Sequence, residues 1–196
     1  MKSICIFGDS ITWGACDEKG GWVERLKVYL AENYECTDVY NLGIPGDTTK
    51  GILERFEFEA QQRVDGEEEL ILMFAIGIND TRLKEISLEK FIGNLNEIIK
   101  RAKKLSQKII FVGLTPVDES VKEVNMDNYL NDNIKSYDGV IRSECKEKNI
   151  LFIDIFDNFS KLDYKKLLDD GLHPNTKGHE IIFKLARDYL INNKIV

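Results

Sequence analysis

The sequence predicts an α/β fold in which a five-stranded parallel sheet lies between two layers of helices. Short runs rich in β-branched and aromatic residues alternate with longer segments whose apolar residues recur at helical spacing. Two of the short runs are apolar over most of their length, which is typical of strands that helices cover on both faces. These features together predict a three-layer α/β/α sandwich.

Five short runs are predicted to be the strands of this sheet. They occupy residues 3–7, 38–42, 70–76, 108–114 and 150–153. The third run is apolar from Leu70 to Ile76, and the fourth is apolar from Ile109 to Val112. Both are therefore expected to be buried on two sides. Five parallel strands joined by helical crossovers predict a flavodoxin-like strand order.

Helices are predicted where apolar residues recur every three or four positions. The clearest stripe lies between residues 88 and 105, a second between 126 and 141, and a third between 181 and 190. Weaker helical patterns cover residues 22–31 and 48–62. The three clear stripes consist of Leu88, Phe91, Ile92, Leu95, Ile98, Ile99, Ala102 and Leu105; Met126, Leu130, Ile134, Tyr137 and Ile141; and Ile181, Ile182, Leu185, Ala186, Tyr189 and Leu190.

Length and composition are ordinary for a globular protein. The chain has 196 residues, of which 43% are apolar and 31% charged, and no repeat or linker interrupts it. Residues 1–196 are therefore expected to form one domain. The net charge of −7 argues against a nucleic-acid partner, because phosphate binding requires an excess of lysine and arginine.

Targeting signals and metal-binding patterns are both missing from the sequence. The apolar run from Ile4 to Phe7 is too short for a signal peptide, and no stretch is long enough to span a bilayer. A full-length product of this sequence is expected to be cytoplasmic, without membrane insertion, and its oligomeric state stays open. The four cysteines (Cys5, Cys16, Cys36 and Cys145) form no Cys-x-x-Cys pair and no metal-ligand spacing with the two histidines. Free thiols, no metal and no cofactor are expected.

The first candidate chemistry is a serine nucleophile with a histidine base. Ser10 follows the first predicted strand, and a serine needs a base to remove its proton. His173 lies three residues after Asp170, close enough for the carboxylate to orient the imidazole toward Ser10. The alternatives are a helix-capping serine and a solvated turn before the last helix. The second histidine, His179, falls in the opening turns of that helix and is expected to be structural or exposed.

Three further groups are candidates for an oxyanion hole. Acyl transfer places negative charge on the former carbonyl oxygen, and preorganised donors stabilise that charge. The candidate donors are the N–H groups of Ser10 and Gly46 and the side-chain amide of Asn79. An ordinary turn at Gly46 and a strand-ending helix cap at Asn79 are the alternatives. All three residues follow predicted strands, and ligands of open parallel sheets bind at the carboxyl ends of strands.

Two features separate this pattern from an α/β-hydrolase. The chain has no Gly-x-Ser-x-Gly around Ser10, and Asp170 lies only three residues before His173. The pattern instead resembles the SGNH hydrolase superfamily, also called GDSL lipases or esterases. Its name gives serine, glycine, asparagine and histidine, matched here by Ser10, Gly46, Asn79 and His173. The matching blocks are Gly8-Asp9-Ser10-Ile11, with isoleucine in place of the usual leucine, Asn41-Leu42-Gly43-Ile44-Pro45-Gly46-Asp47-Thr48, Gly77-Ile78-Asn79-Asp80 and Asp170-Gly171-Leu172-His173-Pro174-Asn175.

The resemblance implies a flavodoxin-like SGNH hydrolase fold and metal-free ester hydrolysis through an acyl-enzyme. Ser10 would carry the acyl group, His173 would act as base and then acid, and Asp170 would orient His173. The N–H groups of Ser10 and Gly46 and the amide of Asn79 would bind the oxyanion. Family substrates include short-chain and aryl esters, acyl-CoA thioesters, lysophospholipids and O-acetylated sugars, and the fold alone does not choose among them.

Features outside these blocks favour a small-molecule ester with a short acyl chain. No long insertion is available to form a large lid, and Trp13 is a candidate wall of the site, with a place in the core as the alternative. Val117, Val121 and Val124 are candidates for lining a small acyl pocket, unless their segment is an ordinary loop. A short-chain carboxylesterase is thus expected, with a sugar O-acetyl group as one candidate substrate.

Two other function classes remain open. An acyl-CoA thioesterase, a lysophospholipase or an acyltransferase would use the same three side chains. A non-catalytic nucleotide-binding domain is the more remote alternative, because the first strand is followed by neither Gly-x-Gly-x-x-Gly nor a P-loop sequence. Replacement of Ser10 by alanine separates the classes, since only an enzyme would lose turnover.

Overall fold

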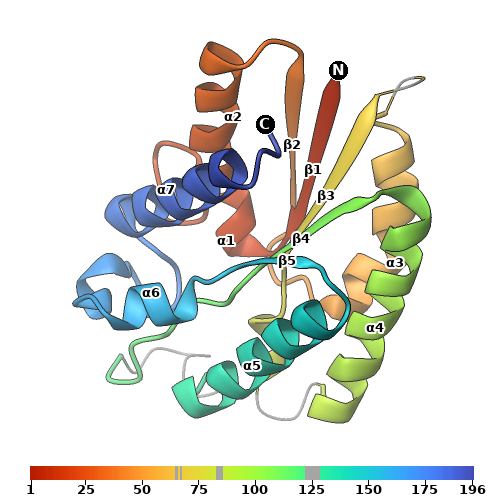
Figure 1. Ribbon diagram of the computed structural model, residues 1–196. Helices are drawn as coiled ribbons and strands as arrows, with labels where there is room; N and C mark the ends of the chain where they lie inside the picture. Colours follow the sequence, from red (N-terminus) through yellow and green to blue (C-terminus); the bar gives the residue numbers. More distant parts are fainter. Residues whose placement is uncertain (65, 67, 83–85, 122–128) are drawn as a thin grey trace.

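The computed structural model describes residues 1–64, 66, 68–82, 86–121 and 129–196. Its strands form one parallel sheet in the order β2-β1-β3-β4-β5, which confirms the predicted fold class and the flavodoxin-like strand order (Figure 1). The strands are β1 (Lys2–Gly8), β2 (Thr37–Gly43), β3 (Glu69–Ala75), β4 (Lys108–Val112) and β5 (Leu151–Ile153).

The end of β4 differs from the prediction for a tertiary reason. The apolar run predicted a strand to residue 114, yet β4 ends at Val112. The N–H of Leu114 donates to the buried carboxylate of Asp138 (2.9 Å) instead of to a neighbouring strand. An acidic side chain from a distant helix therefore turns the chain out of the sheet.

Two layers of helices cover the sheet (Figure 1). One layer holds α2 (Gly21–Asn33) and α7 (Thr176–Asn192), and the other holds α3 (Thr49–Gln61), α4 (Leu88–Leu105) and α5 (Asn131–Glu147). The short helices α1 (Ser10–Trp13) and α6 (Phe156–Ser160) and the 3₁₀ turns η1 (Asn79–Thr81) and η3 (Tyr164–Leu167) were not predicted.

The start of α5 corrects the sequence prediction. The apolar stripe predicted a helix that included Leu130, but Leu130 is extended and 41% exposed, and Met126 lies outside the described residues. Asn131 begins the helix because its side chain is bonded to the backbone of Val117, accepting from the N–H (2.9 Å) and donating to the carbonyl (2.8 Å).

Alternate residues of the strands fill two separate cores. In β1, Ile4 and Ile6 pack toward α2 and α7, whereas Cys5 and Phe7 pack toward α3, α4 and α5. This alternation is the period of two expected for a strand buried on both faces. Phe7 stacks on Phe74 with a centroid distance of 5.7 Å. Strand β1 is therefore packed against helices on both faces.

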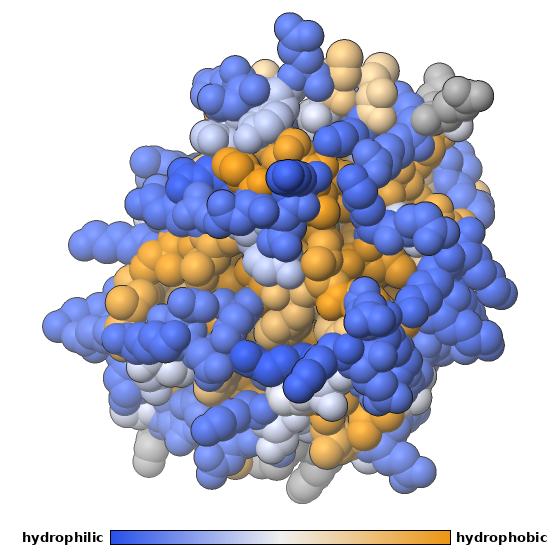
Figure 2. Space-filling model, viewed as in Figure 1, coloured by the Kyte–Doolittle hydropathy of each residue, from blue (hydrophilic) through white to orange (hydrophobic). Residues whose placement is uncertain are grey.

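On the face drawn in Figure 2, blue side chains cover most of the rim, and orange apolar atoms show between them. In the described part of the chain, no helix is long and apolar enough to cross a membrane.

The register of the sheet brings the ends of three strands to one level. Gly8 of β1 pairs with Gly43 of β2 on one side and with Ala75 of β3 on the other. A Cβ on Gly8 would lie 2.5 Å from the carbonyl oxygen of Ala75 and 2.0 Å from Oγ1 of Thr12. Glycine at this position therefore lets α1 turn back tightly onto the sheet.

Candidate active site

Ser10 is the first residue of α1, at the carboxyl end of β1. Asp9 precedes it and caps the short helix, accepting a hydrogen bond from the N–H of Ile11 at 2.9 Å. Asp9 is only 2% exposed. Burial raises the pKa of its carboxyl to about 7, although the Ile11 N–H and the charge of His173 act in the opposite direction. Ser10 is thus presented by a tightly held turn.

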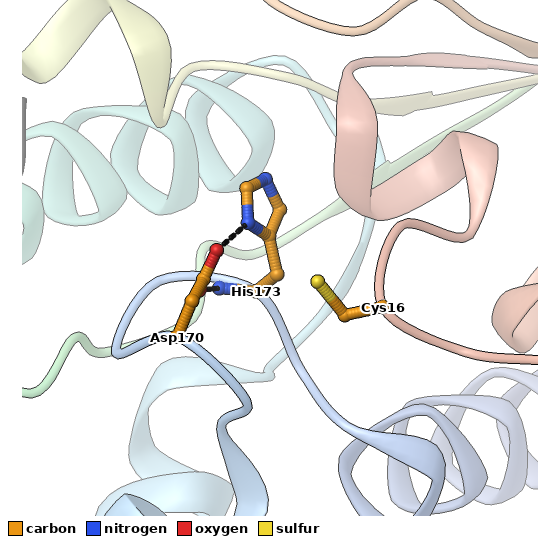
Figure 3. A group of neighbouring side chains, drawn as sticks. All are labelled: Cys16, Asp170 and His173. Atoms are coloured by element: carbon orange, nitrogen blue, oxygen red, sulfur yellow. Dashed lines mark hydrogen bonds and ion pairs between the residues drawn. The ribbon is translucent and has the colours of Figure 1, made fainter.

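Asp170 and His173 lie in a compact turn before α7. One carboxylate oxygen of Asp170 accepts from the N–H of Leu172 (2.9 Å) and from the N–H of His173 (2.8 Å). The other oxygen lies 2.6 Å from Nδ1 of His173 (Figure 3). Burial opposes the charge on Asp170, but the hydrogen bonds from the His173 ring and from the backbone outweigh it and lower the pKa well below its usual range.

A contact between His173 and Ser10 connects this turn to α1 at the carboxyl ends of the strands. Nε2 of His173 lies 2.9 Å from Oγ of Ser10. With Nδ1 donating to Asp170, the imidazole has the tautomer whose Nε2 accepts a proton from the serine. Ser10, His173 and Asp170 therefore form an unbroken chain of hydrogen bonds, the arrangement that activates a serine for attack on an acyl carbon.

Gly46 lies in a tight turn that follows β2. The N–H of Asp47 donates to the carbonyl of Ile44 at 3.0 Å, which closes a turn with Pro45 and Gly46 at its centre. Gly46 has φ +80°, as the third position of a type II turn requires. A Cβ on Gly46 would meet no atom within 4 Å, so this backbone faces open space.

Asn79 lies in η1, after β3, and is 6% exposed. Its Nδ2 donates to the carbonyl of Asp47 (2.9 Å), and its Oδ1 accepts from the hydroxyl of Tyr129 (2.8 Å). Because the carbonyl of Asp47 can only accept, the end of the amide that faces it is the nitrogen, and the Tyr129 hydroxyl donates to the oxygen at the other end. The second hydrogen on Nδ2 has no acceptor within the described residues and is available to an anionic oxygen.

Two acidic side chains, Asp80 (buried) and Asp47 (partly buried), hold these turns against one another. Asp80 accepts from the N–H of Thr49 at 3.0 Å and from its hydroxyl, so it caps α3 from another element. Burial raises the pKa of Asp80 to about 6, and the bonds from Thr49 oppose that rise. Asp47 pairs with Arg55 at 2.8 Å, and Arg55 also donates to the carbonyl of Leu42 at 2.8 Å. The end of β2 and the turn after β3 are thereby both bonded to residues of α3.

The other residues singled out in the sequence have varied locations. Trp13 is 57% exposed on α1, so it is not a core residue. Val117 is fully buried in the hydrophobic core and does not line an open acyl pocket, Val121 is partly buried, and Val124 lies outside the described residues. His179 is fully buried, with Nε2 3.0 Å from the carbonyl of Ala15.

Three residues near the site could not be identified from the sequence. Tyr129 reaches Asn79 from a position 50 residues away along the chain. Asp80 belongs to one of the family blocks, but the sequence did not indicate that its carboxylate caps α3. Cys16 lies close to Asp170 and His173 (Figure 3). No spacing rule relates these pairs, because each contact depends on how distant elements pack.

Comparisons with known proteins agree on one family. The family model described as the GDSL-like lipase/acylhydrolase family matches residues 6–181. A GDSL esterase/lipase of Arabidopsis thaliana is 26% identical over 196 residues, which cover 91% of this chain and 75% of that protein. The human isoamyl acetate-hydrolyzing esterase 1 homolog is 28% identical over 199 residues, covering 92% of this chain and 77% of that protein. The crystal structure of a lipase/acylhydrolase from Enterococcus faecalis superposes with a TM-score of 0.83 at 28% identity, covering 98% of this chain and 97% of that one.

Proposed function

This chain belongs to the GDSL-like lipase/acylhydrolase family and is a carboxylic ester hydrolase, and we propose that it cleaves short-chain esters through an acyl-enzyme on Ser10. The observation that carries the proposal is the hydrogen-bonded chain from Ser10 to His173 (2.9 Å) and on to Asp170 (2.6 Å). These three residues lie at the carboxyl ends of the strands, where the turns that contain Gly46 and Asn79 also lie.

In the proposed acylation step, Ser10 Oγ attacks the ester carbonyl carbon while Nε2 of His173 takes the hydroxyl proton. The resulting imidazolium is stabilised by the Asp170 carboxylate, which remains ionised because its pKa is low. His173 then gives the proton to the departing alcohol oxygen. In deacylation a water oxygen attacks the acyl carbon while His173 takes a proton from that water. His173 then gives this proton to Oγ of Ser10 as the bond between Oγ and the acyl carbon breaks and the carboxylic acid leaves.

The proposed oxyanion hole consists of the N–H groups of Ser10 and Gly46 and the amide of Asn79. Each donor is oriented before substrate binds, by α1, by the type II turn and by the Tyr129 and Asp47 contacts. Donors that need no reorganisation stabilise developing charge more than water does.

The preference for a short acyl group and a soluble alcohol is also a proposal. The human relative whose name specifies isoamyl acetate hydrolysis supports an acetyl group. Trp13 and Ile44, 57% and 46% exposed, follow Ser10 and Gly43 closely in the chain and present apolar surface for the alcohol portion. Acetylated sugars fit the same arrangement, because an exposed tryptophan face packs against sugar C–H groups.

The test is hydrolysis of p-nitrophenyl esters from acetate to long acyl chains by wild type, Ser10→Ala and Ser136→Ala. Ser136 is an exposed serine of α5 and serves as the matched control. We expect the fastest turnover on acetate or butyrate, loss of turnover in Ser10→Ala and no change in Ser136→Ala. Turnover that survives in a folded Ser10→Ala protein would exclude Ser10 as nucleophile. A rate that rises toward long chains, or that appears only with thioesters, would overturn the substrate proposal.

A further inference from the structure

A third side chain, Cys16, meets Asp170 and His173 at the edge of the proposed site. The sulfur of Cys16, a carboxylate oxygen of Asp170 and a ring nitrogen of His173 all lie within 4.8 Å of one another. Figure 3 shows Nδ1 of His173 turned toward Asp170 and the sulfur of Cys16 directed toward this pair. The thiol is exposed, so it can be reached from solvent.

The backbone around Cys16 is held in place rather than free. The N–H of Ala15 donates to the carbonyl of Ser10 at 2.9 Å, and the carbonyl of Ala15 lies 3.0 Å from Nε2 of His179. On the other side, Asp17 accepts from the hydroxyl of Thr176 (2.9 Å) and is ion-paired with Arg25. Cys16 has φ +62°, which side-chain-bearing residues adopt only when their surroundings enforce it. The thiol is thus presented at a defined position beside the histidine.

From this geometry we propose that Cys16, Asp170 and His173 form a binding site for Zn²⁺ and related thiophilic divalent cations, and that binding switches the esterase off reversibly. Thiolate, imidazole and carboxylate are the ligands that zinc prefers in proteins, and three protein ligands leave the fourth position to water. Ligand atoms around tetrahedral zinc are about 3.5 Å apart. The Asp170 oxygen and Nδ1 of His173, now 2.6 Å apart, therefore need to separate by about 1 Å. The sulfur of Cys16, which lies within 4.8 Å of the other two ligand atoms, needs to close in by about 1 Å.

Zinc binding would remove the base by a change of tautomer. A metal bound at Nδ1 takes the lone pair of that nitrogen, so the ring proton moves to Nε2. The Nε2–H can then no longer accept the proton of Ser10, and the hydrogen bond between Nδ1 and Asp170 is replaced by the metal. The thiol proton of Cys16 is released to solvent, and no oxidation or reduction takes place. When a chelator removes the metal, the original tautomer returns.

The binding arm of the test does not depend on the proposed esterase activity. Cd²⁺ is titrated into wild type, Cys16→Ala and Cys36→Ala, and the ultraviolet absorption of the cadmium–thiolate bond is recorded. Cys36 is the matched control, because it is also exposed and has φ +57° but lies immediately before β2. We expect the absorption in wild type and Cys36→Ala and its loss in Cys16→Ala. Equal absorption in Cys16→Ala, or none in wild type, would overturn the metal site.

The inhibition arm rests on the proposed function and uses p-nitrophenyl acetate hydrolysis with added Zn²⁺. Cys16→Ala should keep the basal rate, because the thiol takes no part in the proposed mechanism. It should need at least about tenfold more Zn²⁺ for half-inhibition, since loss of even an outer-shell partner costs 10–100-fold in metal affinity. Excess chelator should restore wild-type activity, and Mg²⁺ should not inhibit, because it prefers oxygen ligands. The same half-inhibition in both proteins would refute inhibition through Cys16, even if cadmium binds.

Discussion

Replacement of Tyr129 by phenylalanine tests whether the orientation of the Asn79 amide matters for catalysis. The hydroxyl of Tyr129 donates to Oδ1 of Asn79 at 2.8 Å, and both residues are nearly buried, at 5% and 6% exposure. Removal of the hydroxyl deprives a buried acceptor of this donor, which costs about 1–3 kcal/mol. The bond from Nδ2 to the carbonyl of Asp47 (2.9 Å) remains and still favours the same orientation.

The expected effect on turnover is therefore intermediate. Complete loss of an oxyanion-hole donor lowers kcat about 10²–10³-fold, whereas a loosened donor that costs about 1–2 kcal/mol lowers it about 5–30-fold. KM should change little, because the tyrosine hydroxyl contacts Asn79 in the protein. The assay is steady-state hydrolysis of p-nitrophenyl acetate, with thermal unfolding of the same samples as a check of the fold.

Two further variants make the prediction sharp. Tyr137→Phe removes another buried tyrosine hydroxyl, which donates to the carbonyl of Ile86 at 2.7 Å, so it should lose stability but keep kcat. In an Asn79→Ala background, Tyr129→Phe should have almost no further effect, because the group that it orients is gone. If Tyr129→Phe lowers kcat by the same factor in both backgrounds, the hydroxyl does not act through Asn79 and the reasoning is refuted.

Three more predictions concern the candidate oxyanion hole and the buried acid beside Ser10. Asn79→Ala should lower kcat on p-nitrophenyl acetate about 10²–10³-fold while thermal unfolding shows an intact fold; an unchanged kcat would remove Asn79 from the oxyanion hole. Gly46→Ala places a Cβ at φ +80°, where it meets no neighbour, so we expect a loss of about 1–2 kcal/mol in urea unfolding from backbone strain alone, together with a lower kcat; full stability would show that the turn tolerates the side chain. The pKa of Asp9 is raised from 3.8 to about 7, so its contribution to stability is fully present below pH 3.8 and is lost as pH rises through 7. Asp9→Asn keeps the acceptor for the Ile11 N–H and removes the ionisation, so its stability advantage over wild type in urea unfolding should grow from pH 5 to pH 8 toward about 4 kcal/mol; an advantage independent of pH would contradict the buried ionisation.

Several parts of this protein follow from local sequence. The alternation of β-rich runs with helical stripes predicted the strands, the five long helices and the flavodoxin-like order, because burial on one or two faces leaves a period that can be read along the chain. The four family blocks also identified the candidate residues, since a nucleophile, a base and its carboxylate partner must come from a few residue types. Asp170 and His173 are close in sequence, so their 2.6 Å contact is local.

Contacts between segments that are distant in sequence could be identified only from the tertiary structure. The stripe that included Leu130 predicted too early a start for α5, because the Asn131 side chain bonds to Val117 and begins the helix there. The end of β4 depends on Asp138, the capping of α3 on Asp80, and the orientation of Asn79 on Tyr129. Each of these hydrogen bonds joins residues far apart in sequence, and no regular spacing relates their positions.

The sequence by itself thus predicted the five strands, the five long helices and the candidate residues for ester hydrolysis, because those properties depend on local periodicity and on side-chain chemistry. The tertiary structure alone decided how these residues are held and what lies beside them. Cys16 shows the difference, since its thiol reaches Asp170 and His173 only because the loop after α1 is bonded to α7. Such neighbours arise from the packing of helices that are distant in sequence, so no local sequence pattern predicts them.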